Sequence, residues 1–264
     1  MPDFIDNTGQ IISLTSNPSK IISLVPSLTE LLCDLGIDED VVGITKFCVH
    51  PKSWFSKKIK VGGTKNLDIQ RIHELQPDLI IASKEENVKT QIEELSVSYP
   101  VWISDIHNVA EALKAIEEIG LLTGKIECAR ELISSITAKF SQLKTVNPKP
   151  KVIYLIWRDP YMTVGGDTFI SSMLEAAGFE NVYKKEHRYP SVTIREMAAQ
   201  KPDYIFLSSE PFPFKEKHVL EITKELPGEK VVLVDGEMFS WYGSRMLYAP
   251  SYFLNLWTYG LHGK

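Results

Sequence analysis

Short, almost continuously apolar runs alternate along this chain with segments whose apolar residues recur at helical spacing. Residues 21–25 and 79–82 are apolar runs, and residues 28–35 place four leucines on one helical face. A strand that is apolar on both faces is typical of a parallel sheet covered by helices. The pattern therefore predicts an α/β fold with parallel sheets.

Local signals indicate where these elements begin and end. Ser27, with Glu30 three residues later, has the spacing of a capping box, and Asp167 is the expected N-cap of a later helix. Residues 4–14 are typical of a hairpin. The remaining predicted strands are 41–44, 101–103, 152–157, 204–207 and 231–234, and the remaining predicted helices are 68–76, 87–96, 168–177 and one after Pro250.

The chain repeats itself on either side of a long helical stretch. Ile69…Pro77-Asp78-Leu79-Ile80 returns 125 residues later as Ile194…Pro202-Asp203-Tyr204-Ile205. We therefore expect two similar Rossmann-like lobes with a ligand cleft between them. The predicted divisions are an N-terminal α/β lobe over 1–123, a linking helix over 124–147 and a C-terminal α/β lobe over 148–264.

Composition argues against two classes of partner. The net charge is −5, and the one short basic run, Lys57 to Lys60, is expected to be a solvated loop, so nucleic-acid binding is not indicated. No apolar run approaches the ~18 residues of a membrane span, so we expect no membrane insertion.

The cysteines and the first residues favour a reduced compartment. Cys33, Cys48 and Cys128 are scattered, which indicates neither a disulfide framework nor a zinc knuckle. Residues 1–9 contain acids and no basic segment followed by an apolar one. These features predict a cytoplasmic protein, and a periplasmic location would require a true N-terminus that is missing.

Signals for catalysis are weak. The sequence has no nucleophile elbow, phosphate loop, dinucleotide fingerprint or zinc-protease motif, so we expect no enzyme, no catalytic residue and no intrinsic cofactor. Cys48 and His50 are weak candidates for a metal site, since their two-residue spacing would put them on one side of a strand. A buried thiol beside a loop histidine is the simpler interpretation.

Aromatic and basic residues in predicted loops are the stronger signal. Loops beyond the carboxyl ends of parallel strands line the ligand crevice of such folds. Aromatic rings with interspersed Arg and His suit a flat, conjugated and partly anionic ligand. These residues are Trp54, Phe55, Trp157, Arg158, Tyr161, His187, Arg188, Tyr189, Phe212, Phe214, Trp241, Tyr242 and Arg245.

Two segments resemble the class III solute-binding proteins of ABC transporters, especially their cobalamin-binding branch. They are residues 21–30, with Pro26-Ser27-Leu28-Thr29-Glu30, and residues 75–82, with Pro77-Asp78. The resemblance implies two lobes joined by a rigid helix and a cobalamin, related corrinoid, haem or ferric siderophore held between them. Together with Arg188 from the aromatic loops, the expected ligand contacts are Pro26, Ser27, His50, Thr64, Ser83, Trp157, Tyr161, Trp241, Tyr242 and Arg245.

The chain departs from this family at two points. Cobalamin binders carry tryptophans where Thr64 and Ser83 stand, which implies a less aromatic wall. The two glutamates that dock the family on its ABC permease are replaced by Gln70 and Arg195. The alternatives to a transport role are a cytoplasmic chelate carrier and a corrinoid or tetrapyrrole enzyme or chaperone using Cys48 and His50.

Overall fold

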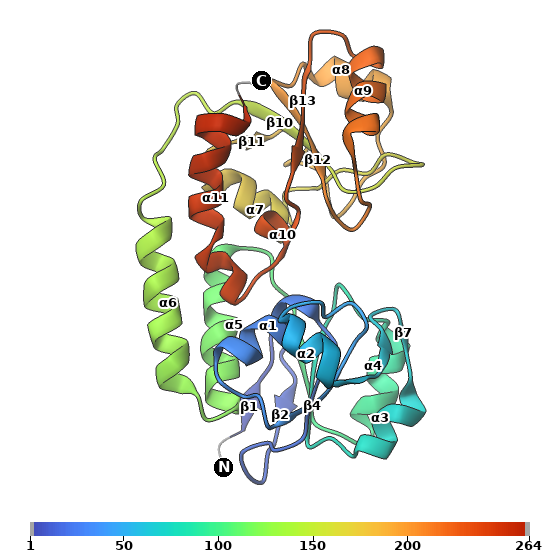
Figure 1. The fold of residues 1–264 in the computed structure, drawn as a ribbon, viewed down its shortest axis with the longest axis vertical. Helices are drawn as coiled ribbons and strands as arrows, with labels where there is room; N and C mark the ends of the chain where they lie inside the picture. Colours follow the sequence, from blue (N-terminus) through green and yellow to red (C-terminus); the bar gives the residue numbers. More distant parts are fainter. Residues whose placement is uncertain (1–2, 262–264) are drawn as a thin grey trace. The chain divides into compact units, whose positions relative to one another are not determined.

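The computed structural model describes residues 3–261, which form two compact units (Figure 1). Unit 1 comprises the chain up to Ile106, residues Ala110–Ser135 and residues Tyr242–Arg245. Unit 2 takes His107–Val109, Ile136–Trp241 and the chain from Met246 onward. The predicted α/β class with parallel sheets is confirmed.

Unit 1 is built on a five-stranded parallel sheet of order β5-β4-β3-β8-β9. Two small antiparallel hairpins accompany it: β1 with β2, as predicted for residues 4–14, and β6 with β7. The strands are β1 Phe4–Ile5, β2 Ile11–Ile12, β3 Ile21–Ser23, β4 Val41–Ile44, β5 Ile59–Lys60, β6 Gly62–Gly63, β7 Asn66–Leu67, β8 Leu79–Ser83 and β9 Val101–Ser104.

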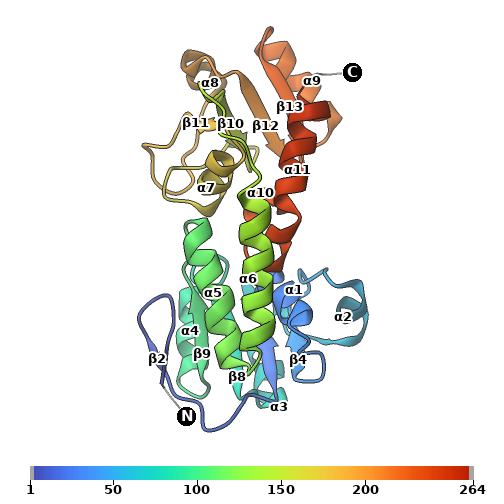
Figure 2. The same cartoon turned by 90° about the vertical axis from the view of Figure 1, so that its left-hand side faces the viewer.

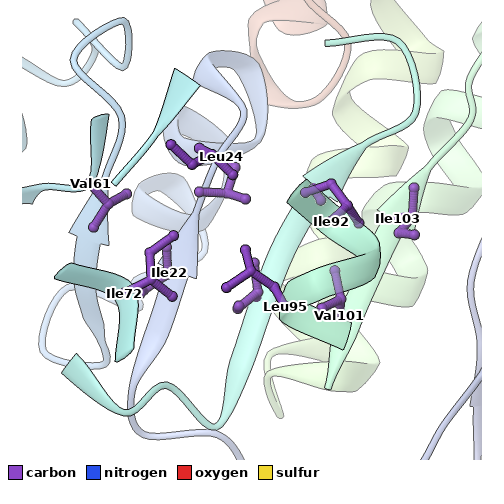
Figure 3. Packing of buried hydrophobic residues seen from close by; sticks show 11 residues of the cluster. Ile22, Leu24, Val61, Ile72, Ile92, Leu95, Val101 and Ile103 are labelled. Carbon is purple, nitrogen blue, oxygen red and sulfur yellow. The ribbon is translucent and has the colours of Figure 1, made fainter. Parts of the chain in front are cut away.

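The apolar runs of unit 1 form its core because the sheet is covered on both faces. Figure 3 shows Ile22 beside Ile72, and Leu24, Leu95 and Val101 belong to the same buried cluster. The helices of unit 1 are α1 Pro26–Asp34, α2 Lys52–Lys57, α3 Ile69–Leu75, α4 Lys89–Ser96 and, except for its first residue, α5 Val109–Leu122.

Unit 2 is built on a four-stranded parallel sheet of order β11-β10-β12-β13. Its strands are β10 Lys151–Leu155, β11 Glu180–Asn181, β12 Tyr204–Ser208 and β13 Lys230–Val234. Its helices are α7 Phe169–Ala176, α8 Ile194–Gln200, α9 Glu216–Glu225, α10 Glu237–Ser240 and α11 Ala249–Asn255, which continues as a π-helix over Leu256–Gly260 (Figure 2). A 3₁₀ turn covers Ser244–Leu247.

The internal repeat has the same local structure in both units. α3 and α8 each end on a left-handed residue, Gln76 and Lys201, both with φ of 48°. The carboxylate of Asp78 then accepts the Lys20 N–H at 2.9 Å, and that of Asp203 accepts the Lys151 N–H at 2.7 Å. Each aspartate therefore fixes the start of the neighbouring strand in its own sheet.

The helix expected over 124–147 is α6, Ile126–Phe140, and the division between the units falls within it, after Ser135. No helix among residues 3–261 is long and apolar enough to cross a membrane.

Two predicted helix caps are wrong. α1 begins at Pro26 with Val25 as N-cap and no side-chain cap, because proline occupies the first turn and lacks an N–H. Thr168 caps α7 by accepting the Ser171 N–H, while the Asp167 carboxylate accepts the Arg188 N–H at 2.6 Å.

Candidate ligand-binding site

In unit 1 the carboxyl ends of the parallel strands carry several predicted contacts. Ser83 ends β8 and Ser104 ends β9. The phenol of Tyr242, from the chain segment that returns to unit 1, lies 3.3 Å from Ser83 Oγ and 3.1 Å from Ser104 Oγ. Burial raises the pKa of Tyr242, so its hydroxyl stays protonated and links the two strand ends.

Asn87 places Thr64 next to this edge. Its side-chain oxygen accepts the Ser83 N–H at 2.8 Å, and its amide nitrogen donates to the Thr64 carbonyl at 3.1 Å. The turn of the β6–β7 hairpin is thereby tied to the end of β8. Thr64 is half-buried, and its short side chain leaves this part of the edge without an aromatic ring.

Pro26 and Ser27 are buried in unit 1. The Ser27 hydroxyl has no hydrogen-bond partner within the described residues. Gly243, with φ of +100°, lies over this helix start: a Cβ there would meet the Ser27 carbonyl oxygen at 3.4 Å. The returning segment therefore covers the beginning of α1.

Arg245 and Glu30 form a two-pronged ion pair in unit 1. Nε and Nη2 of Arg245 donate to Oε2 and Oε1 of Glu30 at 2.8 and 2.6 Å. Burial raises the pKa of Glu30, although the Arg245 charge and hydrogen bond lower it. The Arg245 guanidinium, which the sequence predicts as a ligand contact, therefore already binds Glu30 of α1.

Cys48 and His50 do not share a strand, because β4 ends at Ile44 and both residues follow in a loop. The Cys48 thiol is buried, hydrogen-bonded to Thr29 Oγ1 at 3.0 Å and 3.2 Å from Thr45 Oγ1. Burial raises the pKa of Cys48, which makes it a poor nucleophile. Within the described residues, no three His, Cys, Asp or Glu side chains gather as metal ligands.

This loop also exposes two apolar residues that are not among the expected ligand contacts. Phe47 and Val49 are exposed directly after β4, at 51% and 41%. Trp54 and Phe55, which the sequence places in a loop, lie in α2, where Trp54 is buried. The end of the β4 run at Ile44 is the signal that could have identified Phe47.

In unit 2 the corresponding edge carries an aromatic group. Trp157 follows β10, is 41% exposed and meets Phe212, which follows β12, edge-on with ring centroids 5.8 Å apart. Phe212 in turn packs against Phe214 and the buried His218. Tyr161 is half-buried and packs against the core of unit 2. This edge therefore offers an exposed indole backed by rings.

Trp241 is held by a buried carboxylate. Its indole Nε1–H donates to Glu210 Oε1 at 2.9 Å, and Ser240 Oγ donates to the same oxygen at 2.5 Å. Burial raises the pKa of Glu210, and the charges of Glu237 and Asp235 raise it further. Trp241 itself is buried, so Glu210 fixes its ring at the carboxyl edge of unit 2.

Arg188 is exposed on another loop of unit 2. Its backbone has φ of 55°, and its guanidinium lies over the Tyr189 ring at 5.4 Å. Its loop is fastened to Gly165 and Gly166, whose N–H groups donate to the carbonyls of Arg188 and Glu186. A Cβ on Gly166 would come within 2.0 Å of the Lys184 carbonyl, so only glycine fits there.

Two hollows lie away from these edges, in the part of unit 2 where strands begin. One, of about 430 Å³, is lined by Pro150, Asp203 and Lys230. The other, of about 240 Å³, is lined by Phe140, Lys149 and Gly178. Neither contains a predicted contact.

Comparison with known proteins gives one family and several relatives. The profile of a family described as periplasmic binding protein matches residues 21–226. An uncharacterised ABC transporter substrate-binding lipoprotein of Bacillus subtilis is 28% identical, covering 76% of this chain and 67% of its own. A vitamin B12-binding protein of Vibrio campbellii is 27% identical, covering 74% and 73%.

Solved structures share the fold. The periplasmic vitamin B12-binding protein of Vibrio cholerae superposes with a TM-score of 0.73, covering 92% of this chain and 99% of its own at 19% identity. A possible iron-binding, periplasmic solute-binding protein of Staphylococcus epidermidis gives 0.75, covering 89% and 96% at 24% identity.

The expected cytoplasmic location is wrong. The matching family is described as periplasmic, and the Bacillus subtilis relative is named a lipoprotein. These findings point to an extracytoplasmic location. Residues 1–9 therefore do not indicate where this protein is located.

Proposed function

This chain belongs to the periplasmic binding protein family, and we propose that the solute it binds is cobalamin or a related corrinoid. It is a non-catalytic solute-binding protein of ABC transport rather than an enzyme. The observation that carries the cobalamin proposal is that several relatives, 24–27% identical over about three quarters of this chain, are named vitamin B12-binding proteins.

The exposed residues at the carboxyl edge of each unit support a ligand with apolar, conjugated surface. In unit 2, Trp157 presents an indole that Phe212 supports from the side. In unit 1, Phe47 and Val49 present apolar surface, and the Phe47 ring lies against Gly63, the residue before Thr64. Apolar contacts with a few polar groups that fix orientation are typical of small-molecule sites.

The predicted contacts, together with Phe47, which the structure adds, divide into two groups by exposure. Phe47, His50, Thr64, Trp157 and Arg188 are accessible or half-accessible, and we assign direct ligand contact to them. A second group is buried, packed on a core or hydrogen-bonded inside one unit and holds the edges in shape: Pro26, Ser27, Ser83, Tyr161, Trp241, Tyr242 and Arg245.

An ABC permease is the partner that the family implies, and we propose that it is contacted without the two acidic docking residues. Gln70 lies on α3 and donates to Glu74 Oε1 at 3.2 Å. Arg195 is exposed on α8, next to Glu196, whose carboxylate is occupied by the Thr193 N–H and hydroxyl. These surfaces suit a permease with neutral or acidic groups at the matching positions.

Titration of the purified protein with cobalamin, cobinamide and haemin, followed by tryptophan fluorescence, tests the proposal. A free tryptophan amide serves as the control for absorption by the ligand. Saturable quenching at micromolar or lower cobalamin supports it, because Trp157 lies at the proposed site. If only haemin binds, the ligand is a porphyrin and not cobalamin. If none of the three compounds changes the fluorescence, the proposal of a metal chelate is wrong.

A further inference from the structure

A basic and apolar surface lies on and around α2 in unit 1. Between residues 41 and 67 the sequence has six lysines and no Asp or Glu, although the whole chain has a net charge of −5. Phe55 and Ile59 are also exposed here, at 41% and 43%. We call the following residues the lysine–aromatic patch: Lys52, Phe55, Lys57, Ile59 and Lys60.

The contacts of α2 keep ring and charge together at this surface. Trp54 is buried and anchors the helix, which leaves Phe55 exposed. The ammonium of Lys60 lies 4.8 Å from the centre of the Phe55 ring and donates to the Phe55 carbonyl at 2.5 Å. The patch therefore presents an aromatic side chain with a cation beside it.

The positive charge of the patch is not neutralised by nearby acids. Lys58, which lies between two members of the patch, is paired with Asp38 at 3.3 Å. For Lys52, Lys57 and Lys60, the structure between residues 3 and 261 records no ion pair. Lys52 and Lys57 are exposed and thus available to an anionic partner, and Lys60 adds a third positive charge although its ammonium also donates to the carbonyls of Phe55 and Lys58.

We propose that the lysine–aromatic patch docks unit 1 on a bilayer surface rich in anionic phospholipid. Lysines attract lipid phosphates, and aromatic rings with aliphatic neighbours favour the boundary between headgroups and acyl chains. The rest of this acidic chain is repelled by such a surface, so a local basic patch decides its orientation there. Figure 2 shows α2 at the margin of unit 1, and an extracytoplasmic protein that serves a permease works beside a bilayer.

Co-sedimentation with lipid vesicles tests this docking. One set contains phosphatidylglycerol mixed with phosphatidylcholine, and the other contains phosphatidylcholine alone. We expect binding to the first set, weakened by salt, and none to the second. Because each lysine near an anionic surface strengthens binding by about fivefold, K52Q/K57Q should weaken it roughly 25-fold.

The matched control removes two exposed lysines elsewhere in unit 1. K89Q/K114Q makes the same change in net charge on α4 and α5 and should retain vesicle binding. F55S should weaken the binding that persists at high salt. Equal loss in both double variants, equal binding to neutral vesicles, or no binding to phosphatidylglycerol would overturn the proposal. Circular dichroism and urea unfolding of each variant check its fold whether or not the chain binds cobalamin, so this result is separate from the proposed function.

Discussion

Arg245 holds Glu30 through two hydrogen bonds, across 215 residues of sequence, with both side chains nearly buried at 12% and 14% exposed. The pair attaches the returning segment Tyr242–Arg245 to the first helix of unit 1. Tyr242 adds a second attachment through Ser83 and Ser104. The segment is therefore an integral part of unit 1 even though the chain enters it from unit 2.

Removal of one member of this pair should destabilise the protein. R245M leaves the Glu30 carboxylate buried without its cation, and breaking a buried pair in this way costs about 3–5 kcal/mol. Urea unfolding of the ligand-free protein should show a loss of about 3 kcal/mol. The double variant E30M/R245M should recover part of that loss.

An exposed ion pair provides the comparison. R130M breaks the contact with Glu127 on the surface of α6, and the expected loss is about 0.5 kcal/mol or less. If R245M costs no more than R130M, the attachment through Glu30 does not stabilise unit 1.

The exposed aromatic residues at the two carboxyl edges should contribute to ligand affinity. W157A and F47A should each weaken cobalamin binding about tenfold or more, since aromatic anchors dominate binding energy. Calorimetric titration measures the change. Y259A, which removes an exposed ring from the C-terminal π-helix, should bind normally. Unchanged affinity in both edge variants would remove these residues from the site.

Glu210 should make a pH-dependent contribution to stability. Burial raises its pKa in the folded protein, so the folded state holds this proton more tightly than the unfolded state. The free energy of unfolding of wild type should therefore fall, relative to E210Q, as the pH rises from the ordinary glutamate pKa through the raised folded value. Urea unfolding of both proteins at mildly acidic and neutral pH measures this difference.

Glu196 should change the free energy of unfolding with pH in the opposite direction to Glu210. Hydrogen bonds from Thr193 lower its pKa in the folded protein. Its stabilising contribution is complete above the unfolded pKa and is lost as the pH falls through the folded one. E196Q should thus lose stability relative to wild type as the pH rises. Slopes of the same sign for E210Q and E196Q would contradict the assigned environments.

Thiol labelling should distinguish Cys128 from Cys48. Cys128 is exposed, while Cys48 is buried with a raised pKa. In the native protein a disulfide reagent should modify Cys128 first and reach Cys48 only on unfolding. The variant C128S should lose the fast phase. Rapid native labelling of Cys48 would show that the thiol is accessible.

The fold was largely predictable because its signals are local. Apolar runs became the strands of both sheets, and the repeated Pro-Asp segment became the same helix–strand junction at Asp78 and Asp203. Helix N-caps were harder to predict, because either of two neighbouring residues can cap the same helix. Thr168 rather than Asp167 caps α7, because the Asp167 carboxylate accepts a hydrogen bond from the Arg188 N–H.

The site was less predictable because it depends on contacts between distant segments. No local pattern shows that Arg245 meets Glu30, or that Gly243 lies against Ser27. The position of Phe47 depended on where β4 ends, and Cys48 and His50 were placed on a strand that stops at Ile44. Strand ends therefore limit what sequence reasoning can say about loop residues.

Equilibrium dialysis against cyanocobalamin, read by the visible absorbance of the corrin ring, tests the central claim most directly. The account predicts that protein retains about one corrinoid per chain at micromolar or lower free ligand, and that W157A retains less at the same concentration. Equal cobalamin on both sides of the membrane, with correctly folded protein, would contradict the assignment of a corrinoid to this binding protein.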